Sequence, residues 1–292
     1  MQKTLGDYIS IFISIVGSLA SIIAFYVVFK DNLNEQGVYG VIFLGIISIY
    51  LLISNAWLIA KYRKKTRYVS VFEELNAGYH KIHQGVRNES LDIVELKTGL
   101  ETLCTHLTNI FSEINGHRIS TCIKIIINEN NKPRLITLCR DIYSKTNRVI
   151  GNDDITKHWM TENSDFNFIF ESISEGKVSN TFFHANWLPV HYEYKNTRLG
   201  VSKLSNIPFL SLLLRFFQWP LPYKSTIVVP IIPFSIEGQK DALRGFLCID
   251  SPKNVAFNAQ IDVQILNGVS DGIYTVIDKI FESLNKSTKK GK

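Results

Sequence analysis

The sequence predicts an α+β protein: a two-helix transmembrane hairpin, a coiled-coil signalling helix, and a domain built on a central antiparallel sheet. Three observations support this prediction. Two runs near the start, 8–29 and 38–60, contain no charged residue. A three-four apolar repeat follows them, and strand-like runs beyond residue 116 are then bracketed by helical segments. The 292 residues leave room for one membrane unit and one domain of ordinary size.

Each uncharged run is long enough to cross a hydrocarbon core of about 30 Å as a helix, so we expect the hairpin over 1–68. The connector 30–37 holds a single cation, whereas five follow the second run: Lys61, Arg63, Lys64, Lys65 and Arg67. Positive residues favour the cytosolic side, so both termini are expected there, with the chain in the cytoplasmic (inner) membrane and the lipid bilayer as a partner. A cleaved signal peptide is the alternative for the first run, but a second span follows it directly.

Apolar residues recur from Phe72 to Ile114 at alternating intervals of three and four, and only Glu89 breaks the series. This period is typical of a left-handed coiled coil. We therefore expect the linker 69–97 to pair with a second copy in a homodimer. The alternative is that the stripe from about Ile93 belongs to the first helix of the following domain and packs on its own sheet.

Beyond the helix-stop signal Asn115-Gly116, the pattern becomes strand-like. We expect a hairpin and three more strands at 119–127, 135–140, 178–184, 226–232 and 243–249. A helical stretch at 166–173 lies between them. A long amphipathic helix, 262–284, closes the domain, and a basic tail, 286–292, follows it.

Two of these strands and the closing helix carry a family resemblance. The segments PYKSTIVVPI (222–231) and GFLCIDS (245–251), followed by the final helix, resemble the C-terminal half of a GAF domain. The resemblance extends over 98–285. It implies helices on one face of the sheet, loops that close a small-molecule pocket on the other, and dimerisation through the terminal helices.

Several specialised GAF functions lack their residues here. The Asn-Lys-Phe-Asp-Glu constellation of cyclic-nucleotide-binding members is not found, and no cysteine stands where bilin-binding members attach their chromophore. The cofactor is therefore unknown. The four cysteines are far apart, which favours reduced thiols over a zinc site or a disulfide framework: Cys104, Cys122, Cys139 and Cys248.

Charge and motifs exclude other classes. The net charge of +6 is concentrated in 61–67 and in the tail, so no nucleic-acid partner is expected. The sequence contains no P-loop, H-E-x-x-H or G-x-S-x-G motif. We accordingly expect neither a catalytic set nor a metal site, and a protein that is not an enzyme.

Polar residues at the ends of the expected strands and helices are the candidate ligand-binding residues, because apolar pockets gain specificity from a few convergent polar groups. They are Arg140, Asp141, Asn163, Asn180, Tyr223, Ser225 and Asp250. The alternative is that Arg140 and Asp141 only pair with each other, and that Asp250 only caps a turn. The long insert 187–219 is expected to be a lid, a docking surface, a strip on the bilayer or a core helix.

The resulting hypothesis is a membrane-tethered cytosolic sensor. Its GAF-like domain would bind an unknown small molecule or protein partner and couple it to the membrane helices, in bacterial stress or phage defence. The alternative is a non-catalytic dimerisation scaffold that recruits partner proteins at the membrane. A redox enzyme that uses Cys139 or Cys248 is a third hypothesis.

Overall fold

The computed structural model describes most of the chain from residue 35 onward. The described residues are 35–87, 93–130, 132–147, 157–176, 181–191, 194–197, 219–233 and 242–290, with Gly17, Ser21, Ile23, Tyr26 and Val27 before them. The chain divides into two compact units, Met1–Tyr68 and Val69–Lys292. Every strand among the described residues belongs to the second unit.

The membrane prediction requires a correction. Among the described residues, no helix is both long enough and apolar enough to cross a bilayer, so the predicted localisation as a multi-pass inner-membrane protein is wrong. The run 38–60 is not an element of its own but the first part of helix α2, Glu35–Arg87, which continues through the five cations that follow it. The run 8–29 lies largely outside the described residues, and the transmembrane hairpin is not confirmed.

The end of α2 packs against helix α3, Ile93–Asn115, within the same chain. Glu74 Oε2 lies 2.5 Å from His106 Nδ1, a Cβ on Gly78 would meet Leu103, and Ile82 lies beside Gly99. The contacting residues rise from 74 to 82 along α2, whereas their partners on α3 run from 106 down to 99. The two helices are therefore antiparallel. The early part of the apolar stripe therefore has a partner in its own domain, contrary to our expectation of one seam shared between two copies. The homodimer stays a prediction.

The stripe from Ile93 follows the alternative interpretation. Helix α3 packs on strands β1 and β2, so it is the first helix of the domain. Its buried face contains apolar residues at helical spacing: Leu96, Leu100, Leu103, Leu107, Ile110 and Ile114. Burial of this face against the sheet, rather than a second coiled-coil strand, accounts for the period.

Six strands form one antiparallel sheet. They are β1 Ser120–Glu129, β2 Lys132–Arg140, β3 His158–Trp159, β4 Phe183–Ala185, β5 Ser225–Ile231 and β6 Gly245–Ser251. Their order is β3-β2-β1-β6-β5-β4, and every neighbouring pair is antiparallel. The predicted hairpin and the two late strands are confirmed. The predicted strand 178–184 is described only from residue 181, as β4, and the short β3 was not predicted.

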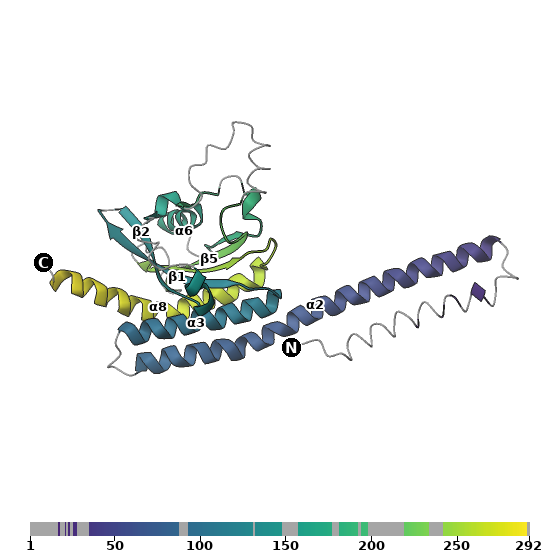
Figure 1. Ribbon diagram of the computed structural model, residues 1–292, viewed down its shortest axis with the longest axis horizontal. Helices are drawn as coiled ribbons and strands as arrows, with labels where there is room; N and C mark the ends of the chain where they lie inside the picture. The colour runs from purple at the N-terminus through teal and green to yellow at the C-terminus, as the bar shows by residue number, and fades with distance from the viewer. Residues whose placement is uncertain are drawn as a thin grey trace, which may run out of the picture. The chain divides into compact units, whose positions relative to one another are not determined.

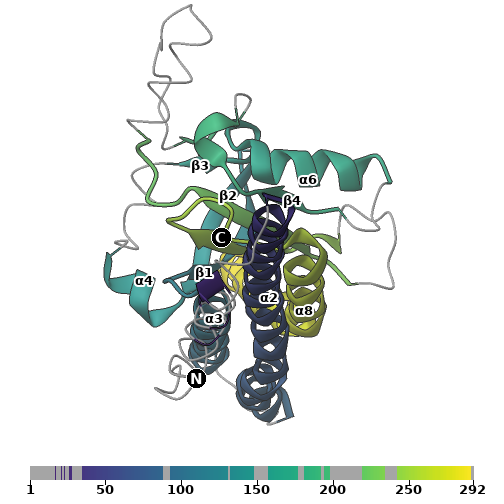
Figure 2. The same ribbon diagram turned by 90° about the vertical axis from the view of Figure 1, so that its right-hand side faces the viewer.

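Helices cover both faces of the sheet. Helices α3 and α8, Ala259–Lys290, lie on one face, and α6, Ser164–Ser174, lies over the other (Figure 1 and Figure 2). The short elements are α4 Ile142–Asn147, η1 Met160–Glu162 and η2 Leu188–Val190. Successive side chains of a strand point to opposite faces. The odd-numbered residues Ile123 of β1 and Ile249 of β6 are fully buried on the side of α3 and α8.

The predicted α+β fold is therefore confirmed for the sheet and its flanking helices. The even-numbered residues of β1, β5 and β6 point toward α6, where the apolar cluster includes Val228, Phe246 and Ile169. Polar groups among these even-numbered positions form the candidate site.

Candidate functional site

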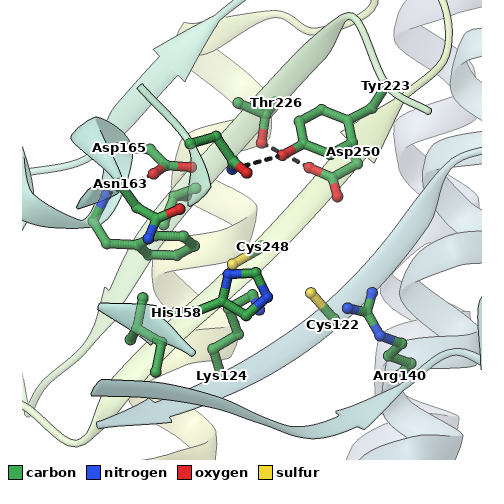
Figure 3. Close-up of a pocket in the computed structure, with 14 residues that line it drawn as sticks. Cys122, Lys124, Arg140, His158, Asn163, Asp165, Tyr223, Thr226, Cys248 and Asp250 are labelled. Carbon is green, nitrogen blue, oxygen red and sulfur yellow. Dashed lines mark hydrogen bonds between the residues drawn. The ribbon is translucent and has the colours of Figure 1, made fainter. Parts of the chain in front are cut away.

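The floor of the candidate site is one row of side chains across the sheet. Arg140 of β2 is paired with Cys122 of β1, Cys122 with Cys248 of β6, and Cys248 with Val228 of β5. The next row pairs Asp250 with Thr226. These residues border a pocket between the sheet and α6, shown in Figure 3. It is also lined by Lys124, Leu135, His158, Asn163, Asp165, Phe166, Asn196 and Tyr223.

An irregularity in the β1–β2 ladder gives Arg140 its orientation. Lys124 pairs with Thr137 and the adjacent Ile123 with Cys139, so Leu138 is skipped in the pairing. An extra residue of this kind inverts the alternation of faces beyond it. Cys139 consequently points to the face of the sheet that α3 and α8 cover, where its Sγ lies 3.9 Å from Cys104 Sγ on α3. Arg140 points into the pocket instead.

The roof is formed by the start of α6. Two hydrogen bonds fix the side chain of Asn163: its Nδ2 donates to the carbonyl of Trp159 at 2.7 Å and to Thr197 Oγ1 at 2.8 Å. Asp165 is buried at 3% exposure, and its carboxylate accepts from the Phe166 backbone N–H at 3.0 Å and the Tyr194 hydroxyl at 3.2 Å. Burial raises the pKa of Asp165 to about 7, because desolvation disfavours the charged form more than these hydrogen bonds favour it.

Phenol and amide groups connect the roof to the sheet. The Asn196 amide donates to the hydroxyls of Tyr194 at 3.3 Å and Tyr223 at 3.2 Å, and these hydroxyls lie 3.4 Å apart. Burial, followed by the charge of Asp165, raises the pKa of Tyr194 well above its usual value. On the sheet, Thr226 Oγ1 donates to Asp250 Oδ1 at 2.8 Å.

Charges of both signs converge on the pocket. Lys124 and Arg140 are the cations, and Asp165 and Asp250 are the carboxyl groups. In Figure 3, Arg140 and Cys122 lie at one end of the site, and Asp165 and Asn163 lie at the other. The cavity has a volume of about 40 Å³. One water molecule occupies about 10–15 Å³ of such a cavity, so the cavity holds a few waters or a ligand of a few atoms.

The two thiols on the floor differ in acidity. The pKa of Cys122 is lowered to about 6, first by its hydrogen bond with Cys248 and then by the charges of Arg140 and Lys124, against burial and Asp250. The pKa of Cys248 is raised well above its usual value, first by burial and then by its hydrogen bond with Cys122. The pair therefore favours a thiolate on Cys122 and a thiol on Cys248.

Four of the seven residues expected from the sequence line the pocket: Arg140, Asn163, Tyr223 and Asp250. Asp141 does not. It is fully buried beneath α4, and its carboxylate accepts from the backbone N–H of Thr121 at 2.9 Å and of Ser144 at 2.8 Å. It is thus the N-cap of α4 and a tie to β1.

Ser225 is also structural. Its hydroxyl lies 2.9 Å from the carbonyl oxygen of Asn186 and 2.7 Å from that of Lys253, so it fixes two loops at the start of β5. Asn180 lies outside the described residues, as do 198–218 of the long insert.

The rest of the polar lining was not among the candidate ligand-binding residues expected from the sequence: Cys122, Lys124, His158, Asp165, Asn196, Thr226 and Cys248. The alternation of β1 was available as a signal, because it places Lys124 and Cys122 on one face. Alternation along β5 likewise places Thr226 on the same face as Val228, and alternation along β6 places Cys248 on the same face as Asp250. His158 and Asn196 lie on short or irregular segments that carry no comparable period, whereas Asp165 lies in the first turn of α6.

Helices α3 and α8 on one face of the sheet and the pocket on the other match the architecture that the family resemblance implied. The fold is GAF-like. No family model and no curated protein matches the chain.

Solved structures include similar proteins at low sequence identity. A type II free methionine-R-sulfoxide reductase from Thermoplasma acidophilum is 14% identical, with a TM-score of 0.37; the similarity covers 63% of this chain and 96% of that one. The GAF domain of an Acinetobacter phosphoenolpyruvate-protein phosphotransferase is 10% identical, with a TM-score of 0.39, over 74% and 98%. The corresponding domain from Coxiella burnetii is 12% identical, with a TM-score of 0.37, over 74% and 98%. Scores of this size carry no argument about the ligand or the activity of this chain.

Proposed function

We propose that the GAF-like domain is a sensory domain that binds a small polar ligand in the pocket between α6 and the sheet. The observation that supports this proposal is the convergence of two cations and two carboxyl groups, from β1, β2, β6 and α6, on one small cavity. Charges are rarely kept in the interior of a domain without a partner or a function, because desolvation is costly.

The charges define the chemistry of the ligand. Arg140 and Lys124 favour an anionic group such as a carboxylate, since guanidinium and ammonium groups donate charge-assisted hydrogen bonds. Asp165, at the other end of the site, and Asp250 favour an amino or hydroxyl group. The cavity of about 40 Å³ limits the ligand to a few non-hydrogen atoms unless the side chains of Tyr223 and Asn196 move. The best match is a small amino or hydroxy acid.

The sheet offers a direct mechanical path from the pocket to the helices. Cys122 and Asp250 border the pocket, while their chain neighbours Ile123 and Ile249 are buried on the opposite face, under α3 and α8. The buried Ser270 hydroxyl of α8 also donates to the carbonyl of Pro230 on β5. A ligand that shifts β1, β5 or β6 would therefore change how α3 and α8 pack, which is the proposed output.

Thermal unfolding of the full chain with a panel of small amino and hydroxy acids tests the proposal. A ligand at 100 times its dissociation constant should stabilise the protein by about 2.7 kcal/mol. Arg140→Gln should remove that effect. Lys145→Gln is the matched control, because Lys145 is a cation outside the pocket, paired with Glu101 at 2.9 Å.

Equal stabilisation of both variants, or no stabilisation by any compound in the panel, would contradict the proposal. In the second case the fold would act as a scaffold without a ligand. Partner proteins captured equally well by the wild type and Arg140→Gln would then identify that role.

A further inference from the structure

The floor of the pocket holds two thiols in a geometry that permits a bond between them. Cys122 and Cys248 are directly paired across the antiparallel strands β1 and β6. Directly paired residues have Cα atoms about 4.5–5.5 Å apart, within the range of about 4.4–6.8 Å that a disulfide requires. Both side chains line the pocket, so a small molecule that enters it reaches both sulfur atoms (Figure 3).

The surroundings of the two thiols are unequal. Arg140 is paired with Cys122 on the side away from Cys248, and Lys124 follows two residues along β1 on the same face. Both cations favour a thiolate on Cys122, whereas Asp250 opposes one. Cys248 keeps its proton, since burial and the hydrogen bond with Cys122 both raise its pKa. This asymmetry separates an attacking sulfur from a resolving one.

We infer that Cys122 and Cys248 form an oxidation site for hydrogen peroxide or another small hydroperoxide, with Cys122 as the attacking thiolate and Cys248 as the resolving thiol. The inference goes beyond the proposed function, because it needs the oxidant and no other ligand. The oxidant also agrees with the size of the cavity, since hydrogen peroxide has only two non-hydrogen atoms.

The chemistry proceeds in two balanced steps. The Cys122 thiolate attacks one peroxide oxygen, so an S–O bond forms, the O–O bond breaks, and the departing hydroxide takes a proton to become water. The sulfur is oxidised to a sulfenic acid while the peroxide is reduced. The Cys248 sulfur then attacks Cys122, an S–S bond forms, the S–O bond breaks, and the Cys248 proton leaves with the hydroxide as a second water.

The chain contains an internal control for this chemistry. Cys104 and Cys139 lie on the opposite face of the sheet, with their Sγ atoms 3.9 Å apart and both side chains buried. The pKa of Cys104 is raised well above its usual value, first by its hydrogen bond with Cys139 and then by burial. Proximity alone would make this pair as reactive as the pocket pair, whereas the thiolate argument makes it much slower.

The test is to treat the reduced full chain with hydrogen peroxide, alkylate the remaining thiols and map the products by peptide mass spectrometry. A disulfide between Cys122 and Cys248 is expected, with Cys104 and Cys139 still alkylated. In Cys248→Ser, dimedone should trap a sulfenic acid on Cys122. In Cys122→Ser, Cys248 should stay reduced. Double replacement of Cys104 and Cys139 by Ser should leave the pocket reaction unchanged.

Arg140→Gln preserves both thiols and tests the electrostatic step. Loss of one cation should slow oxidation of Cys122 about twofold at pH 7, because a rise of its pKa from about 6 to about 7 lowers the thiolate fraction from about nine-tenths to about one-half. Lys145→Gln should react at the wild-type rate, and thermal unfolding of each variant establishes that it is folded.

Two results overturn the inference. One is oxidation of Cys104 and Cys139 at a rate equal to or above that of the pocket pair. The other is an inert Cys122 in folded wild-type protein. A wild type that binds an amino or hydroxy acid but resists peroxide removes this inference alone, and the reverse result removes only the proposed function.

Discussion

Tyr79 on α2 donates a hydrogen bond to the backbone carbonyl of Gly268 on α8, with 3.2 Å between the hydroxyl and carbonyl oxygens. The pKa of this hydroxyl is raised above its usual value, first by burial and then by the charge of Asp271. The contact attaches the end of α2 to the helix that covers β5 and β6.

Replacement of Tyr79 by Phe should lower the free energy of unfolding by about 0.5–1.5 kcal/mol, because the Gly268 carbonyl loses a donor while the ring stays in place. Urea denaturation of the full chain measures the change. Tyr50→Phe is the matched control, because Tyr50 is 69% exposed, and it should unfold like the wild type. Equal unfolding midpoints for all three proteins would show that the hydrogen bond contributes nothing.

Asp141→Ala should cost about 2–4 kcal/mol of unfolding free energy. The change leaves the buried N–H groups of Thr121 and Ser144 without their acceptor and removes the N-cap of α4. Asp141→Asn should cost less, because the amide oxygen still accepts. Glu162→Ala, an exposed carboxylate, should stay within about 0.5 kcal/mol of the wild type. A loss for Asp141→Ala no larger than for Glu162→Ala would contradict its structural role.

Gly245→Ala should prevent folding or cost more than about 3 kcal/mol. A Cβ at Gly245 would lie 2.0 Å from the Lys124 carbonyl oxygen and 2.9 Å from the Ile125 Cα, and a backbone atom has no rotamer by which to move away. Gly268→Ala is the contrasting change, since nothing lies within 4 Å of its added Cβ in the helix. It should stabilise the protein by about 0.5–1 kcal/mol. Circular dichroism during thermal unfolding distinguishes the two outcomes.

Asp165 should make stability depend on pH. Its folded pKa of about 7 lies above the unfolded value of 3.8, so the folded state holds a proton that the unfolded state releases between these values. The contribution of Asp165 to the free energy of unfolding is fully present below about pH 4, falls as the pH rises, and is lost above about pH 7. Asp165→Asn cannot titrate, so the stability difference, wild type minus variant, should fall between pH 4 and 7 and then stay level. A pH-independent difference would refute the assignment.

Strand and helix positions in the GAF-like domain were largely predictable. The hairpin expected at 119–127 and 135–140 corresponds to β1 and β2, and the runs at 226–232 and 243–249 correspond to β5 and β6. Each has a local signal: a β-branched or alternating run between turn residues. The final helix likewise has an apolar face of its own.

The site was predictable only in part. Arg140 was expected at the end of a strand, but it reaches the pocket because the ladder skips Leu138, and Asp141 beside it is a cap. Cys122 and Cys248 lie in two different expected strands, 119–127 and 243–249, far apart in the sequence. They are partners because β6 returns to pair with β1, and such long-range pairing leaves no local trace.

The membrane prediction was drawn from the absence of charge in two runs of the sequence. The run 38–60 became part of α2, and the described part of the chain contains no helix that meets both requirements.

The sequence by itself determined the longer strands and helices of the domain and which of their residues face inward, because side-chain period is set by neighbours along the chain. The tertiary structure alone decided that α2 folds back on α3, that Arg140 points toward α6, and that Cys122 meets Cys248. These depend on register between distant segments, where a shift of one residue reverses the face of every side chain beyond it.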